Sequence, residues 1–137
     1  MAKTIKFSVG RFILQIALGL FFLVGGIWAL TGGGDAASLA IKEIFSGDFR
    51  KILVIVFGII EILSGVFLIL ELFLQTALKN LRKIFLLIIA IVWIVAIVLI
   101  DFFGGHGLFH TNAFLSWLYQ FAGHLIILGG IIVINVF

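Results

Sequence analysis

The sequence predicts an all-α, polytopic membrane protein built as a four-helix transmembrane bundle. Of its 137 residues, 64% are hydrophobic and only 11% are charged, whereas a soluble domain is about half apolar and about a quarter charged. Four apolar stretches are each long enough to cross a bilayer core of about 30 Å, which takes roughly 20 helical residues. β-Branched residues are frequent in them, but backbone groups in lipid must be paired within each segment, which favours helices. We therefore expect one transmembrane domain over residues 1–137.

The first predicted span covers residues 12–30 and contains no formal charge, with Gln15 as its polar interruption. The basic N-terminus before it is also typical of a signal peptide. However, the apolar run is longer than the usual signal-peptide core, and the glycine-rich segment 31–35 is a poor cleavage site. We favour a helix that is retained in the mature protein.

The other spans are predicted at residues 52–74, 84–100 and 113–136. The second contains two acids, the third is wholly apolar, and the fourth contains one histidine and no formal charge. Small and amide-bearing residues follow one face of three of the spans, where they let helix backbones approach closely. These are Gln15, Gly19 and Gly26, then Gly58, Ser64 and Gly65, then Ser116, Gln120, Gly123 and His124. The third span offers only Ala90, Trp93 and Ala96, so we expect it to be the most lipid-exposed.

A short amphipathic helix is predicted in the loop between the first two spans. Its apolar positions follow the i, i+3, i+4, i+7, i+8 pattern over Ala37, Ala40, Ile41, Ile44 and Phe45. Asp35 is placed to cap its start, and Asp48 to cap the start of the second span. Such a helix either lies in the membrane interface or plugs the end of the bundle.

The basic residues predict the orientation of the chain. Six of the nine flank the N-terminus and the second loop, namely Lys3, Lys6, Arg11, Lys79, Arg82 and Lys83. The other three lie in the first loop beside three acids, and the third loop has none. The positive-inside bias therefore places both termini in the cytoplasm. We expect the cytoplasmic membrane of a bacterium or an archaeon.

Glu61 is the residue that most needs an explanation, because it lies near the middle of the second span. An unpaired charge at that depth costs on the order of 3 kcal/mol on insertion-based scales. His124 lies at the centre of the fourth span, at a similar depth, and is a candidate hydrogen-bond partner if those spans are neighbours. Ser64 and Gln120 extend the same polar interior. The pair either holds the helices together through a hydrogen bond or is a protonatable site that serves a quinone, a proton path or a small substrate.

Two further groups of polar residues are weaker candidates. Arg11 and Glu71 share a depth near the cytoplasm and either form an interfacial ion pair or snorkel independently. Asp101, His106 and His110 cluster on the outer side, where histidines and a carboxylate can bind Zn²⁺. The glycines between them leave that geometry undefined. The chain has no cysteine, which excludes thiolate metal sites and disulfides.

With these residues in view, the chain resembles the DoxX-like family of small four-helix membrane proteins. An arginine opens the first span in the glycine- and phenylalanine-rich segment 11–26, and the second span has a Gly-x-x-Glu-x-x-x-Gly core at Gly58, Glu61 and Gly65. Family members often carry a lysine just after the first span's glycine, and residues 27–31 contain none. The resemblance implies an accessory membrane subunit near respiratory or oxidative-stress enzymes, including a quinone-linked thiosulfate oxidoreductase.

The leading functional hypothesis is a small accessory or anchor subunit of a membrane complex, possessing no catalytic activity of its own. It would associate with other membrane subunits or with itself, and would contact quinone at Glu61 and His124. The alternative is a small transporter or channel that uses Glu61 as a proton or cation site. Four helices alone make a thin-walled pore, so the alternative predicts a homo-oligomer. Nothing in the sequence indicates nucleic-acid binding, because the basic residues are few and flank apolar runs.

Overall fold

A computed structural model describes residues 9–32, 36–104, 107–109 and 111–136. It contains five α-helices and one π-helical segment over these residues, and no strand. The elements are α1 (Val9–Leu30), α2 (Ala36–Ile44), α3 (Gly47–Phe73), α4 (Gln75–Val98), η1 (Leu99–Phe103) and α5 (Phe114–Val136). Four of the helices, with η1 extending α4, are long and apolar enough to cross a membrane. The predicted fold class is confirmed, and the chain is an integral membrane protein.

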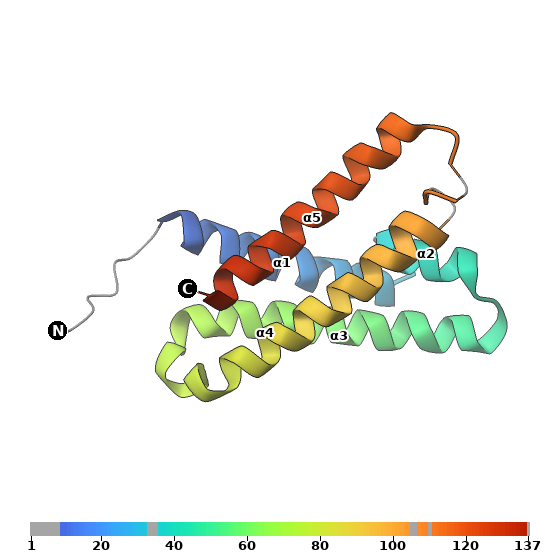
Figure 1. The fold of residues 1–137 in the computed structure, drawn as a ribbon. Coiled ribbons are helices and arrows are strands. Elements are labelled where there is room, and N and C mark those ends of the chain that lie inside the picture. The colour runs from blue at the N-terminus through green and yellow to red at the C-terminus, as the bar shows by residue number, and fades with distance from the viewer. Residues whose placement is uncertain (1–8, 33–35, 105–106, 110, 137) are drawn as a thin grey trace.

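The bundle consists of two antiparallel helix pairs (Figure 1). Helices α1 and α3 run side by side and form the most extensive contact, while α4 and α5 cross them obliquely. Helix α1 begins, and α5 ends, at the same end of the bundle, which is also where α3 turns into α4. The core between the pairs is made of fully buried side chains from every span, including Leu18, Phe22, Leu68, Trp93 and Ile131.

Glycines set the close approach of α1 and α3. A Cβ atom at Gly65 would lie 2.5 Å from the backbone N of Leu23 and 2.6 Å from the carbonyl oxygen of Gly19. At Gly26 it would lie 2.5 Å from the carbonyl oxygen of Gly58. The two glycines on each helix are seven residues apart in the sequence, so they recur on one face after two turns. The predicted contact through small residues is confirmed for these two spans.

Two boundaries differ from the prediction. Helix α3 begins at Gly47, ahead of residue 52, and its N-cap residue is Ser46. Asp48 therefore lies inside the first turn, and its predicted role as the cap is wrong. Helix α4 begins at Gln75, so only Leu74 separates it from α3. The basic residues assigned to the second loop lie on this helix, because lysine, arginine and glutamine are good helix formers that extend a span beyond the lipid.

Helix α2 closes the end of the bundle opposite the termini. It packs on α3 and on η1, and it buries Ala40 and Ile41. These are two of the positions predicted for its apolar face. The packing favours the plugging role over a helix that lies on the surface alone. Asp35, the predicted cap, lies outside the described residues.

The prediction that the third span is the most lipid-exposed is wrong. About 39% of the third span is buried within the protein, against 17% of the fourth. The third span lies between its neighbours and buries large side chains such as Leu86, Ile89 and Trp93. Composition misled here because large apolar residues fill a protein core as readily as they face lipid.

Candidate functional site

The main polar site joins the end of α4 to α5 and is centred on Asp101. Asp101 is completely buried, with 0% of its surface exposed, although it lies only one residue beyond the predicted third span. It belongs to η1, where the helix widens into a π-turn. Such turns are rare and occur frequently at functional sites.

The π-turn leaves the backbone carbonyl of Asp101 available to two other donors. The indole N–H of Trp117 donates to it over 2.6 Å, and the backbone N–H of Leu108 donates to it over 2.6 Å. A carbonyl oxygen has two lone pairs, so both bonds can form together. These two bonds connect η1 to α5 and to the loop that follows η1, and they hold the backbone of Asp101 in place.

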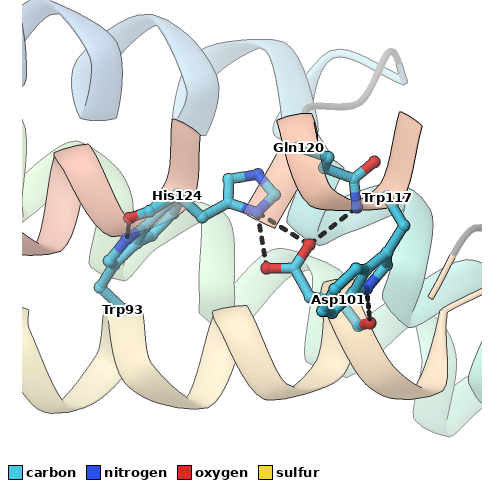
Figure 2. Close-up of polar contacts among 5 residues, drawn as sticks. All are labelled: Trp93, Asp101, Trp117, Gln120 and His124. Carbon is cyan, nitrogen blue, oxygen red and sulfur yellow. Dashed lines mark hydrogen bonds and ion pairs between the residues drawn. The ribbon is translucent and has the colours of Figure 1, made fainter. Parts of the chain in front are cut away.

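The carboxylate of Asp101 receives two side chains from α5 (Figure 2). Gln120 Nε2 donates to Oδ1 over 2.8 Å, and His124 Nδ1 lies 2.8 Å from Oδ2 and 3.0 Å from Oδ1. Helical side chains tilt toward the N-terminus of their own helix. Because α4 and α5 are antiparallel, the carboxylate and the imidazole tilt toward one another, which brings them into contact along the helix axis.

Aromatic rings surround the imidazole. Trp93 donates its indole N–H to the backbone carbonyl of His124 over 3.0 Å, and its ring meets the His124 ring edge-on at a centroid distance of 5.6 Å. Phe21 and Phe22 of α1 lie edge-on to Trp93 at 5.7 and 5.6 Å. The site therefore combines one polar pair with an apolar aromatic wall.

This geometry gives His124 two defined chemical states. A neutral imidazole donates Nδ1–H to Asp101 and presents Nε2 as an acceptor, whereas an imidazolium keeps the same bond and presents Nε2–H as a donor. Nε2 points away from Asp101 (Figure 2). The His124 side chain is 12% exposed, so the ring is not completely enclosed. The arrangement can accept or donate one hydrogen bond, or take up one proton, without losing its anchor.

The structure places Nδ1 of His124 on Asp101, a partner that was not predicted from the sequence. The pairing of His124 with Glu61 stays a prediction. Matched depth was a valid argument only for neighbouring spans, and α5 packs on α4 and α1. From the sequence, Asp101 is a candidate metal ligand on the outer side and not a predicted partner of His124. A signal was available in the sequence: the third and fourth spans are joined by a short loop, and consecutive helices are usually neighbours.

Glu61 lies on α3, on the side that faces α1. It is 2% exposed and shares the inward face of α3 with Gly58 and Gly65, both of which contact α1. Ser64 was expected to extend the Glu61 and His124 pair. Its hydroxyl instead donates to the carbonyl of Ile60 over 2.7 Å, one turn back in the same helix. Of the predicted polar residues, His124 and Gln120 meet at Asp101, while Glu61 and Ser64 belong to α3.

A second polar cluster joins all four spans at the end that carries the termini. Glu71 is ion-paired with Arg82 at 3.1 Å, and it accepts a hydrogen bond from Gln15. Gln15 also donates to the carbonyl of Leu68 over 3.0 Å, and Arg82 donates to the carbonyl of Ile134. The cluster therefore links α1, α3, α4 and α5.

Arg11, predicted to pair with Glu71, lies close enough for the charges of Glu71 and Arg82 both to act on it. Glu71 forms an ion pair with Arg82, whose Nε lies 3.1 Å from Oε1 of Glu71. From the sequence, Arg82 is a loop residue. In the structure it lies on α4, and its side chain reaches Glu71 of α3 and Ile134 of α5.

The zinc hypothesis stays a prediction, because the structure does not describe all of its candidate ligands. No group of three potential ligands occurs among the residues that the structure describes. His106 and His110 lie outside them, and Asp101 is engaged with Gln120 and His124.

Comparison with protein-family models, curated proteins and solved structures gives no match to this chain. The resemblance to the DoxX-like family therefore stays a prediction from its motifs.

Proposed function

We propose that this protein is a small membrane accessory or anchor subunit whose Asp101–His124 pair binds the polar end of a lipid-soluble ligand of the quinone class. One observation carries the proposal: a completely buried carboxylate holds Nδ1 of a histidine whose side chain is still 12% exposed. A carboxylate behind a histidine fixes the tautomer and the orientation of the ring. His124 Nε2 then meets a ligand carbonyl or hydroxyl in a defined direction.

The surroundings suit an aromatic, apolar ligand. Trp93 lies edge-on to His124 and Phe22 lies edge-on to Trp93, and aromatic rings pack favourably edge-on or offset against other rings. Phe21 is exposed on the bundle surface, and only a small part of the fourth span is buried within the protein. A ligand dissolved in the bilayer would therefore approach from the side, between α1 and α5.

The accessory role rests on sequence and composition. The four spans account for most of the chain, and the DoxX-like motifs at Arg11, Gly58, Glu61 and Gly65 imply a subunit of a respiratory or oxidative-stress complex. We place it in a bacterial or archaeal cytoplasmic membrane with both termini in the cytoplasm. Purification in mild detergent followed by mass spectrometry tests the role: larger foreign subunits support it, and a pure monomer contradicts it.

Quinone binding is tested by the fluorescence of the protein's own tryptophans, because Trp93 contacts His124. Full-length protein in lipid nanodiscs is titrated with decylubiquinone and with menadione. We expect saturable quenching, and in His124→Gln a Kd about tenfold higher, since a hydrogen bond to a charged or polarised group contributes about 1.5 kcal/mol and 1.4 kcal/mol corresponds to tenfold. Asp101→Asn weakens binding through the lost orientation of His124.

Tyr119→Phe is the matched control, because Tyr119 is on the same helix but is 85% exposed. Its Kd is expected to equal that of the wild type. Circular dichroism verifies that each variant is folded. Quenching that rises linearly with quinone concentration, or an unchanged Kd in folded His124→Gln, would refute the binding site.

The transporter alternative is kept because of Glu61, which is nearly fully buried in the second span. It predicts a homo-oligomer and loss of proton or cation flux in Glu61→Gln, measured in proteoliposomes. Flux that persists in Glu61→Gln would exclude this residue as the transported ion's site.

A further inference from the structure

A pocket of about 240 Å³ opens at the end of the bundle opposite the termini. It lies where three elements meet: the end of α1, helix α2 and the start of α3. Its charged lining consists of three basic side chains, Lys42, Arg50 and Lys51. Among the described lining residues there is no acid. At ~30 Å³ for each water, it has room for about eight waters, enough for a polyatomic anion.

The basic side chains are positioned by the fold and not merely nearby in sequence. Arg50 Nε donates to the carbonyl of Phe45 over 2.6 Å, which anchors the guanidinium at the turn between α2 and α3. The terminal nitrogens of such an arginine are suited to bidentate contact with a phosphate. Lys42 approaches from α2, and Lys51 is the next residue of α3.

The rest of the pocket is apolar and continues onto the outer surface of the spans. Ala29, Leu30 and Val54 form its wall, and the neighbouring Ile52 and Ile55 are exposed on α3. The pocket lies at the level where the predicted spans 12–30 and 52–74 stop, which is where phospholipid head groups lie. Lysine and arginine side chains close to a membrane surface attract anionic head groups.

We infer that this pocket binds an anionic phospholipid, with the phosphate held by Lys42, Arg50 and Lys51 and an acyl chain along Leu30 and Ile55. A soluble phosphate shares the charge chemistry but gains nothing from the apolar wall, which is why a lipid is the better occupant. The inference is independent of the proposed quinone site, because the two sites share no residue.

Native mass spectrometry of the full-length protein in a neutral detergent tests the inference. Phosphatidylglycerol and phosphatidylcholine with identical acyl chains are titrated separately. We expect phosphatidylglycerol adducts to form at a concentration at least tenfold lower than phosphatidylcholine adducts. In Lys42→Gln/Lys51→Gln that preference is expected to fall about tenfold, because each basic residue near an anionic lipid contributes appreciably to its binding. Arg50 is kept, so that its bond to Phe45 is preserved.

Lys79→Gln/Lys83→Gln is the matched control, since it removes the same charge from exposed lysines at the other end of the bundle. It is expected to change the preference less than twofold. Equal losses in both double variants would mean general surface attraction and would overturn the inference. Inorganic phosphate that binds and competes as strongly as phosphatidylglycerol would also overturn it, in favour of a soluble anion site.

Discussion

Buried charged residues in this protein are used to join helices. Asp101 holds Gln120 and His124 of α5, and Glu71 holds Gln15 of α1 and Arg82 of α4. An ionised carboxylate removed from water costs several kcal/mol unless charges or hydrogen bonds offset it. Each of these two acids has partners from other elements, so separating the helices would expose a buried charge.

The Glu71 cluster gives a stability prediction. Glu71→Gln leaves Arg82 without its ion pair, and we expect a loss of about 3 kcal/mol in the free energy of unfolding, as found when one partner of a buried pair is removed. Unfolding of purified protein in detergent measures it. Lys83→Gln, which removes an exposed charge from α4, is expected to change stability by less than about 0.5 kcal/mol.

The double variant Glu71→Gln/Arg82→Gln distinguishes a true pair from two separate effects. Its loss is expected to be smaller than the sum of the single losses, because neither residue then leaves a buried charge behind. Additive losses would show that the two residues do not act as a pair.

Among the helices, α1 and α3 approach one another through their glycines, whereas Gly129 of α5 has open space beside it. The two contacts are backbone against backbone, with Gly19 facing Gly65 and Gly26 facing Gly58. Nothing lies within 4 Å of a Cβ added at Gly129 of α5. The same residue type therefore has different roles, according to what its helix packs against.

Gly65→Ala and Gly26→Ala are each expected to destabilise the protein by about 2 kcal/mol, because backbone atoms cannot rotate away as a side chain can and the helices must move apart. Gly129→Ala is the matched control. It is expected to be neutral or slightly stabilising, since alanine favours a helix over glycine. The midpoint of thermal unfolding in detergent reports both. An equal effect at all three positions would contradict the close contact of α1 and α3.

At the level of the whole molecule, the two ends of the bundle differ. The end where α1 begins carries the Glu71 cluster and four of the described basic residues, Arg11, Lys79, Arg82 and Lys83. The opposite end carries α2, the basic pocket and, nearby, the Asp101 site. Asp101 and Glu71 thus fasten the helices at opposite ends.

The charge distribution predicts that a C-terminal green fluorescent protein fusion is fluorescent and that a C-terminal alkaline phosphatase fusion is inactive. A phosphatase fusion placed after residue 112, in the loop before α5, is expected to be active. The reverse pattern of activities would invert the orientation that we propose.

The four spans, the α2 helix and the glycine contact of α1 with α3 followed from the sequence, because length, periodicity and small residues are local properties. The partners of the polar side chains did not follow. Asp101 looked like a rim residue and Arg82 like a loop residue, yet both reach into the bundle, because helices α4 and η1 extend beyond the apolar run and turn them inward. Packing over the whole chain decides which helices are neighbours. It is the reason that Nδ1 of His124 contacts Asp101.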